Sequence, residues 1–405
     1  MKLKWILALL LAVPMFADEV AITKEGIDAA AQEQQEQQQQ PPTPEVEPGS
    51  DEIPEGTPTT PSAEDTNGRL ESMGEAFTEM RNSLENLNRM RFSGYLQAQY
   101  VNDERSRNEL GGSTGTRNLD QFSVRRARVK FTYQFSPTSR FVLQPDITSS
   151  GVSLKDGYVE FTEPWTTWKN TLTAGQFNWP FGFEIMYSSS AREMPERSRV
   201  IRTLFPGERD RGVMLSGLGL GERLRYQIAV VNGTGTSRSD DVNKRKDIVG
   251  RLGYSFGPLD VAASFYRGSD LVATSTQAAG IEFDKERLGF DFQWATPVPG
   301  LGLRGEYIRG TQAPAANTTR TQSHDVDGWY FYAIQNLGTR HQFVVRLDEY
   351  DADTNVDNNS IRTLGGSYIF HLDANSKVMA AYEKPEHEIN DPADNVFTLR
   401  YQYSF

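Results

Sequence analysis

Apolar and polar residues alternate with a period of two along most of the chain from Phe92 to the C-terminus. The last run shows the pattern most clearly, with one apolar and one polar face: Phe397, Leu399, Tyr401, Tyr403 and Phe405 against Thr398, Arg400, Gln402 and Ser404. The run from Gln342 to Asp348 repeats it, with Val344 as an exception. Because successive side chains of a strand point to opposite faces, this alternation predicts half-buried β-strands.

About 16 such runs can be placed along residues 92–405. They begin near residues 92, 121, 139, 154, 170, 210, 223, 246, 259, 285, 301, 327, 340, 361, 376 and 396. Polar segments rich in Gly, Asn, Asp and Ser separate the runs, and short turns alternate with longer loops. This arrangement predicts an up-and-down antiparallel meander.

A different period precedes the strands. Within residues 69–91, apolar residues recur at spacings of three and four and form a seam: Leu70, Met73, Phe77, Met80, Leu84 and Leu87. This spacing predicts a short coiled-coil helix of about 35 Å. An isolated helix of this length is marginal in water, so its apolar stripe needs a partner. Self-association and packing against the chain's own domain are both open.

The N-terminus has the features of an export signal. In residues 1–17, Lys2 and Lys4 precede an apolar run from Trp5 to Val13, and cleavage is expected after Ala17. The run is shorter than the roughly 20 residues that a membrane-spanning helix needs. Residues 18–68 are rich in Gln, Pro and Glu, which predicts a disordered linker in the periplasm.

Charge is unevenly distributed. The formal net charge of the chain is −12, but 13 of its 54 acidic residues lie in residues 18–68, which contain a single base, Lys24. Residues 69–405 hold 41 acidic and 39 basic residues and are nearly neutral. The acidity of the sequence therefore describes the linker and says little about the rest.

The chain contains no cysteine, which excludes disulfides, cysteine-ligated metals, thiol nucleophiles and an acyl anchor. The four histidines (His324, His341, His371 and His387) lack the spacing of metal ligands, so neither a metal nor another cofactor is expected. No Ser–His–Asp constellation stands out, and we expect no enzymatic activity. Nothing suggests nucleic-acid binding.

The apolar faces distinguish two fold classes, a soluble β-sandwich and a membrane barrel. Aromatic residues gather near the ends of these faces, as in the aromatic girdles of an outer-membrane barrel: Tyr95 and Tyr100, Tyr133 and Phe135, Tyr330 and Tyr332, and Tyr401, Tyr403 and Phe405. Together with export, this favours an all-β fold, a 16-stranded antiparallel transmembrane β-barrel over residues 92–405, following the coiled coil and disordered arm. The terminal Phe405 resembles the assembly signal of bacterial outer-membrane proteins.

Several stretches resemble the phosphate-selective porin (O/P type) family of outer-membrane channels. The most specific are AGQFNWPFGFE (174–184) and the run at 188–215; FSVRRARVKFTYQF (122–135), DGYVEFTEPW (156–165), IAVVNGTG (228–235) and DIVGRLGY (247–254) occur in the family's order. The resemblance covers roughly residues 92–405. It implies a 16-stranded barrel, usually a homotrimer, with inward-folded loops and basic residues along the lumen.

Two groups of basic residues are candidates for lining the pore and binding anions. Arg126, Arg128 and Lys130 occupy one face of a predicted strand at successive intervals of about 6.6–6.8 Å. Pairing with carboxylates such as Asp146 or Asp156 is the open alternative. The second group lies in the long segment after PFGFE, which by resemblance folds inward: Arg192, Arg197, Arg199 and Arg202. Interspersed acids make a salt-bridged network equally consistent.

The expected function is passive diffusion of small hydrophilic solutes, with anions such as phosphate as candidates, through a trimeric channel in the bacterial outer membrane. The expected partners are these solutes, outer-membrane lipids and further copies of the chain. The alternative is a structural anchor that tethers the envelope through the coiled coil and the acidic arm.

Overall fold

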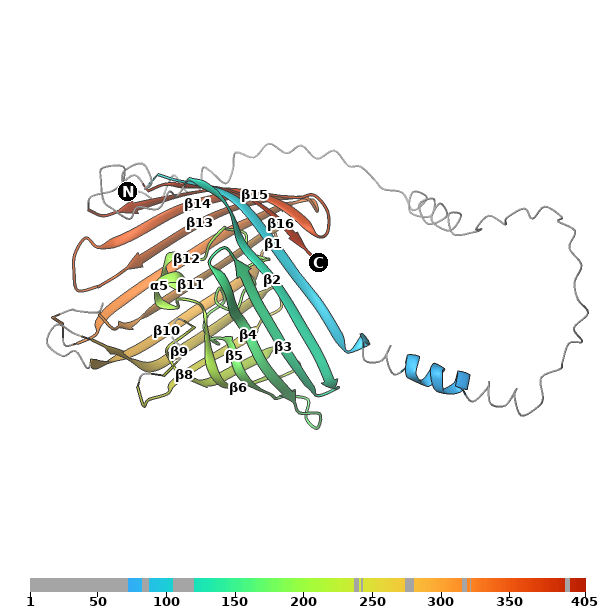
Figure 1. The fold of residues 1–405 in the computed structure, drawn as a ribbon. Coiled ribbons are helices and arrows are strands. Elements are labelled where there is room, and N and C mark those ends of the chain that lie inside the picture. The colour runs from blue at the N-terminus through green and yellow to red at the C-terminus, as the bar shows by residue number, and fades with distance from the viewer. Residues whose placement is uncertain are drawn as a thin grey trace, which may run out of the picture. The chain divides into compact units, whose positions relative to one another are not determined.

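The structure is a computed structural model that describes residues 72–81, 87–104, 120–236, 240–241, 243–273, 280–314, 319–320, 322–389 and 394–405. These residues form sixteen β-strands that curve into one barrel (Figure 1). The strands are β1 (Met90–Asp103), β2 (Gln121–Ser136), β3 (Ser139–Thr148), β4 (Gly151–Thr162), β5 (Thr171–Asn178), β6 (Arg209–Gly219), β7 (Leu224–Val231), β8 (Asp247–Ser255), β9 (Leu259–Val272), β10 (Ile281–Ala295), β11 (Leu301–Gln312), β12 (His324–Leu337), β13 (His341–Asp351), β14 (Ser360–His371), β15 (Ser376–His387) and β16 (Val396–Ser404).

Each strand pairs antiparallel with its neighbours in the chain, and β1 pairs with β16 to close the ring. The closing register places Leu96 opposite Tyr403. Closure satisfies the backbone hydrogen bonds of every strand and leaves no exposed sheet edge. The 16-stranded antiparallel barrel expected from the alternation is therefore confirmed.

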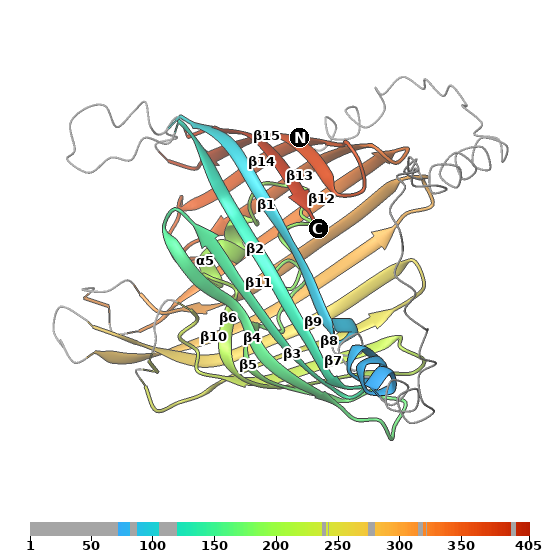
Figure 2. The same ribbon diagram turned by 45° about the vertical axis from the view of Figure 1, so that its right-hand side comes forward.

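The two rims of the barrel differ. One rim, called the turn rim here, carries the tight turns, such as Ser136 to Ser139, together with the start of β1 and the end of β16. The other, the loop rim, carries longer connections, including residues 179–208. Figure 2 shows the strands tilted between these rims.

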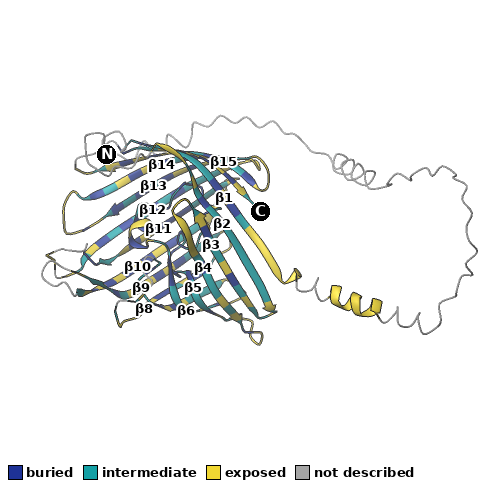
Figure 3. Ribbon diagram, viewed as in Figure 1, coloured by how far each residue is buried: buried dark blue, intermediate teal, exposed yellow. Residues whose placement is uncertain are grey.

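Outward and inward faces alternate along the strands, and buried and exposed positions alternate with them in Figure 3. Outward side chains such as Phe290 (57% exposed) and Phe343 (46% exposed) are apolar. Many inward positions are polar or charged, and Arg346 and Asp348 are fully buried. Inside and outside are thus reversed relative to a soluble barrel, as a lipid surround and a wet lumen require.

Three of the predicted girdle tyrosines face the lumen instead. Tyr330 and Tyr332 are 2% and 1% exposed and belong to an internal cluster, so their assignment to a girdle was wrong. Tyr95 also points inward, where its hydroxyl lies 2.5 Å from Ser189 Oγ. Val344, the exception in the alternation, is buried in the same internal cluster.

Before the barrel, residues 72–81 are helical. Three seam residues, Met73, Phe77 and Met80, are 66%, 69% and 52% exposed, and Leu87 is 62% exposed. Leu70, Leu84, the signal peptide and the linker lie outside the described residues. Among the described residues, none of the helices has the length and apolarity needed to cross a membrane.

Candidate functional site

The segment between β5 and β6, residues 179–208, is called the inner loop here. It contains the short helix α5 (Arg199–Leu204). This helix contacts β12 and β13, which lie across the closed ring from β5 and β6. The inner loop therefore crosses the lumen.

One side of the inner loop is apolar. Its buried side chains pack against inward-facing residues of β9 and β11–β13: Phe181, Ile185, Val200, Ile201, Leu204 and Phe205 against Tyr266, Ile308, Val326, Tyr330, Tyr332, Val344 and Tyr350. The Phe205 ring centroid lies 4.7 Å from that of Phe181 and 6.1 Å from that of Tyr266. Burial of one side chain of this size contributes roughly 1.5–3 kcal/mol, so the cluster is a strong attachment.

Two inward-facing glycines make room for this attachment. A Cβ atom at Gly289 would lie 2.8 Å from the ring of Phe181. A Cβ atom at Gly328 would lie 2.8 Å from the side chain of Val200 on α5. Close-packed interiors do not accommodate such overlaps without movement, so a larger residue at either position would push the inner loop off the wall.

Polar side chains of the wall bind the main chain of the inner loop. Ser264 Oγ accepts a hydrogen bond from the Gly182 N–H at 3.0 Å, and the Glu306 carboxylate accepts one from the Phe183 N–H at 3.2 Å. Gly182 has a φ of +58°, and a side chain there would overlap that carboxylate. Other wall residues donate to loop carbonyl groups: Arg346 to Glu196, Arg400 to Pro195, Gln97 to Ser189, and Lys377 and Gln402 to Ser190.

The inner loop also holds its own fold through Arg197, which is 4% exposed. The guanidinium of this residue donates to the main-chain oxygens of Glu184 at 2.7 Å and Ile185 at 3.0 Å, and it pairs with the Glu208 carboxylate. Glu184 in turn accepts hydrogen bonds from the Ser198 N–H at 3.0 Å and the Ser198 hydroxyl at 2.7 Å. Arg197 is therefore engaged in holding the loop.

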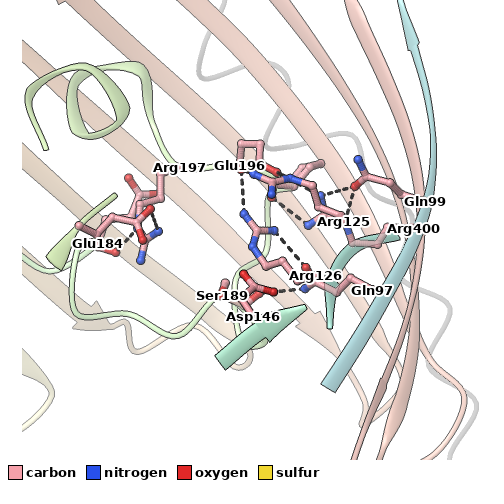
Figure 4. A network of polar contacts seen from close by, with 12 residues as sticks. Gln97, Gln99, Arg125, Arg126, Asp146, Glu184, Ser189, Glu196, Arg197 and Arg400 are labelled. Carbon is pink, nitrogen blue, oxygen red and sulfur yellow. Dashed lines mark hydrogen bonds and ion pairs between the residues drawn. The ribbon is translucent and has the colours of Figure 1, made fainter. Parts of the chain in front are cut away.

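The other side of the inner loop is polar and centres on the Glu196 carboxylate (Figure 4). Arg125 binds it through two hydrogen bonds, from Nε to Oε1 at 2.8 Å and from Nη2 to Oε2 at 3.0 Å. Arg126 Nη2 lies 2.9 Å from Oε2, and Arg400 Nη2 lies 3.4 Å from Oε1. Three guanidinium groups thus surround one carboxylate.

Arg125 belongs to the site but could not be identified from the sequence. It precedes Arg126 directly, so strict alternation of the two faces would place Arg125 on the outer face. The register between β1 and β2 shifts here, so that Gln97 pairs with Arg126 and Ala98 pairs with Val124. Arg125 is the extra residue of this β-bulge, and bulges redirect side chains. Its side chain consequently reaches the inner loop together with that of Arg126.

The arginine cluster fixes the charge of Glu196. Burial alone would raise the pKa of this carboxyl, but the guanidinium groups of Arg126, Arg125, Arg192 and Arg400 hold that pKa well below its ordinary value. The carboxyl therefore stays ionised near neutral pH.

The first predicted group, on β2, is divided between the inner loop and a cavity. Arg126 is 4% exposed and donates to Gln97 Oε1 at 3.0 Å as well as to Glu196. Arg128 is 7% exposed, and its Nε lies 2.9 Å from Asp146 Oδ2. Lys130 is half-buried and lines a cavity.

The second predicted group is divided in the same way. Arg192 and Arg197 are each 4% exposed and lie within the folded loop. Arg199 is half-buried and Arg202 is exposed on α5, and both line a cavity at the loop rim. The structure therefore brings some predicted residues to open space and packs others inside protein.

Two cavities lie between the inner loop and the turn rim, and both reach Met186; they are called the turn-side cavities. One has a volume of about 600 Å³ and presents four basic and no acidic side chains: Arg140, Lys169, Arg225 and Arg251. The other, of about 390 Å³, presents four basic side chains and one acidic: Arg128, Lys130, Arg197 and Arg209, with Asp156. Their walls are predominantly basic.

A third cavity, of about 360 Å³, lies on the loop side of the same loop and is called the loop-side cavity. Its lining is balanced, with four basic and four acidic side chains: Arg125, Arg199, Arg202 and Arg400, with Asp103, Glu196, Glu383 and Asp394. The lining of the turn-side cavities is therefore predominantly basic, whereas that of the loop-side cavity is balanced. No group of three or more histidine, aspartate or glutamate residues suited to holding a metal ion occurs among the described residues.

A family model described as phosphate-selective porin O and P matches residues 91–269. This part of the chain is similar to the porin family. The matched region includes β2, the inner loop and both turn-side cavities' basic residues. No match to a curated protein was found.

Several solved structures of bacterial porins and channels are similar to this chain. They include an anion-selective porin from Comamonas acidovorans (12% identity, TM-score 0.57, 78% of this chain and 99% of that chain). Salmonella typhi OmpF, in a complex with daunomycin, has 11% identity and a TM-score of 0.56, over 78% and 97%. The outer-membrane channel DcaP of Acinetobacter baumannii has 12% identity and a TM-score of 0.55, over 78% and 97%. At these identities the likeness shows the fold.

This porin is an outer-membrane channel that allows passive diffusion of small hydrophilic solutes, as the family match over residues 91–269 and the closed barrel with a polar lumen indicate together.

Proposed function

We propose that the porin passes small anions in preference to cations, with phosphate-sized inorganic anions among its solutes. The lining of the turn-side cavities carries this proposal, because basic side chains outnumber acidic ones in both. A fixed cation in a narrow, partly dehydrated lumen attracts anions more strongly than the same cation in bulk water. The name of the family and that of the anion-selective porin are in agreement.

The carboxylate partners of these basic residues also support a preference for anions. Arg251 Nη2 lies 2.6 Å from Asp291 Oδ1, and Arg225 Nη2 lies 2.9 Å from Asp260 Oδ1. Neither carboxylate is part of the cavity lining, so the partners orient the guanidinium groups while the donors face the solute. Guanidinium groups held in this way can bind phosphate or carboxylate with two parallel hydrogen bonds.

Block of the chloride current by phosphate tests this proposal in planar bilayers. Phosphate added from the turn rim should reduce the current more than phosphate added from the loop rim, because the basic cavities lie on the turn side. Arg140→Gln combined with Arg225→Gln should abolish the difference, whereas Arg362→Gln, an exposed arginine of β14, should preserve it. A chloride current that phosphate leaves unchanged from both sides contradicts the proposal.

We propose further that the porin is a homotrimer whose N-terminal seam is an assembly element. The exposure of Met73, Phe77 and Met80 supports a partner for this helix. Signal-peptide removal after Ala17, a periplasmic position for residues 18–68, and a role of Phe405 in barrel assembly belong to the same proposal.

Deletion of residues 18–90 separates assembly from tethering. Loss of trimers in detergent, with conductance retained by the monomer, supports the assembly role of the seam. Intact trimers combined with a blebbing envelope support the alternative, in which the seam and the acidic arm tether the outer membrane.

A further inference from the structure

Four arginines lie with their guanidinium groups over aromatic rings in the part of the barrel interior that the structure describes. Three of them form an ion pair with a carboxylate: Arg128 with Asp146, Arg304 with Glu193, and Arg346 with Asp348. The fourth, Arg287 on β10, donates from Nη2 to the neutral side-chain oxygen of Gln312 at 2.6 Å. No ion pair joins Arg287 to a carboxylate among the described residues, so it differs from the other three.

The unpaired guanidinium group of Arg287 is deeply buried. Arg287 is 3% exposed, and its Cζ lies 4.5 Å from the ring centroid of Phe205 and 5.2 Å from that of Tyr266. Its Nε is buried and has no hydrogen-bond partner among the described residues. Removing a cation from water is costly unless an anion and hydrogen bonds compensate for the lost hydration. The surroundings of Arg287 therefore favour an anion that the described chain does not supply.

A second unpaired donor belongs to Trp179, at the start of the inner loop. Trp179 is 4% exposed, and its ring centroid lies 5.5 Å from that of Phe205 and 6.4 Å from that of Tyr266, the two rings that also contact Arg287. The indole Nε1 is buried and has no hydrogen-bond partner among the described residues. The indole N–H can only donate, and buried donors are nearly always paired in folded proteins. Both unpaired groups are thus donors beside the same two rings.

Arg287 and Trp179 line one cavity of about 250 Å³, which is called the Arg287 cavity here. It lies near the loop rim, between the inner loop and the rim-side ends of β9, β10 and β11. Much of its lining is apolar: Leu204, Pro206, Leu271, Val272, Ala313 and Pro314. Its charged lining residues are Lys285, Arg287 and Asp270. The cavity therefore combines unpaired donors with an apolar wall.

Lys285 and the neighbouring carboxylates satisfy one another. Lys285 Nζ lies 3.0 Å from Asp270 Oδ1 and 3.5 Å from Asp247 Oδ2, and it donates to the Gly233 carbonyl oxygen at 3.1 Å. Asp247, which does not line the cavity, also accepts a hydrogen bond from the Tyr266 hydroxyl. Lys285 is thus engaged by groups of the chain, and Arg287 is the cation of this cavity that is available to a solute.

We propose that the Arg287 cavity binds a small organic acid that has one carboxylate and an apolar body. The carboxylate accepts hydrogen bonds from the Arg287 guanidinium and from Trp179 Nε1, and it supplies the missing negative charge. The apolar body packs against Leu271, Val272 and Pro314, which removes its surface from water. The site extends the solutes of the channel from inorganic anions to organic acids.

The lining favours a monocarboxylate over inorganic phosphate. Phosphate presents acceptor oxygens on every side, whereas the apolar wall of the cavity has no donors to offer them. A second negative charge would also meet the Asp270 carboxylate in the same cavity, and like charges repel. The Arg287 cavity and the turn-side cavities share no lining residue, so this inference rests on the channel function and not on the preference for phosphate-sized anions.

Calorimetric titration of the purified full-length porin with benzoate in detergent tests the proposal. We expect saturable binding that Arg287→Gln weakens at least tenfold, because the charge-assisted hydrogen bonds are lost. Trp179→Phe keeps the ring but removes the N–H, and it should weaken binding about threefold to tenfold. Trp294→Phe, an outward residue of β10, and Arg362→Gln, an exposed arginine of β14, are the matched controls and should bind benzoate as the wild type does.

Two further ligands separate the carboxylate from the apolar body. Benzamide, a neutral molecule of nearly the same shape, should bind at least tenfold more weakly than benzoate, and so should inorganic phosphate. Equal affinity for benzoate and benzamide overturns the proposal, because the charge of Arg287 would then have no role. Equal affinity for benzoate and phosphate also overturns it, because the apolar wall would then have none.

A variant of the turn-side cavities distinguishes this site from the proposed anion path. Arg140→Gln combined with Arg225→Gln should leave the affinity for benzoate unchanged while it alters the block of the chloride current by phosphate. Thermal unfolding of every variant shows whether the barrel is intact. Benzoate affinities of Arg287→Gln and Trp179→Phe that both equal that of the wild type overturn the proposal, and so does loss of benzoate binding in the turn-side variant.

Discussion

The inner loop has two attachments of opposite character. Towards β9–β13 it is held by packed aromatic and aliphatic side chains, and towards β1, β2 and β16 by arginines around Glu196. Apolar packing depends on shape and volume, so it determines where the loop lies in the lumen. The polar attachment carries charge, so it also contributes to the potential that a solute meets. Position and selectivity therefore depend on different residues and can be changed separately.

The largest expected effect comes from the apolar attachment. Phe205→Ala removes a fully buried ring from the centre of the cluster and should lower the free energy of unfolding by about 3–5 kcal/mol. The loosened loop should raise single-channel conductance and current noise. Phe290→Ala, at an outward position that is 57% exposed, is the control and should leave conductance unchanged. Equal conductance of both variants would show that the cluster does not hold the loop.

A change in the wall should act on the same attachment from the other side. Gly328→Val adds atoms where a Cβ would already lie 2.8 Å from Val200, and such overpacking costs about 1–3 kcal/mol. Displacement of α5 should increase conductance. Gly302→Val is the control, since no atom lies within 4 Å of its Cβ position. Thermal unfolding and conductance of the two variants measure the difference.

A change in the polar attachment should alter the ion selectivity of the channel more than its conductance. Glu196→Gln removes the carboxylate among three guanidinium groups and should shift the reversal potential further towards anions. Lost ion pairs should cost about 1–3 kcal/mol of stability, while the apolar cluster keeps the loop in place. A large rise in conductance, like that of Phe205→Ala, would show that the polar attachment positions the loop as well.

A single cation of the turn-side cavities should have a smaller effect. Lys130→Gln should shift the reversal potential moderately towards cations and change stability by about 0.5 kcal/mol or less. Lys384→Gln, which is half-exposed on β15, provides the control. Identical reversal potentials for the two variants would argue against Lys130 facing the solute path.

Lowering the pH from 8 to 5 should have the smallest effect on the stability and selectivity of the porin. The folded-state pKa of Glu196 lies well below its ordinary value, so its ion pairs stabilise the porin fully above the unfolded-state pKa of about 4.3. That stabilisation is lost only as the pH falls below this value and through the folded-state pKa. Thermal unfolding and reversal potential should therefore show no transition from this residue between pH 8 and pH 5. A wild-type transition in that window that Glu196→Gln abolishes would contradict the assignment.

The sequence predicts the barrel well because one local rule, the alternation of inward and outward side chains, applies to every strand. The rule takes no account of the inner loop. The residues whose side of the wall it predicts wrongly are those that contact this loop. Tyr330 and Tyr332 break it because the loop gives them an apolar surface inside the lumen. Arg125 breaks it because a bulge turns its side chain inward.

The roles of the predicted arginines depend on where the inner loop lies, which no local pattern encodes. Arg126 and Arg197 are basic residues of the kind that could line an anion path. In the structure, however, each of them donates a hydrogen bond to a residue of the inner loop. Arg140, Arg225 and Arg251, which line the largest turn-side cavity, stand out only when β2–β8 are assembled into one wall. The basic lining of the turn-side cavities thus comes from several strands that are separated in sequence.

The reversal potential of the wild-type porin across a bilayer with a KCl gradient tests the central claim most directly. Because the turn-side cavities are basic, the reversal potential should have the sign that corresponds to preferential permeation of chloride over potassium. A double variant, Arg140→Gln with Lys130→Gln, should move that potential towards zero without changing the apolar attachment. A wild-type reversal potential with the sign of preferential potassium permeation would contradict the account. A potential that the double variant leaves unchanged would also contradict it.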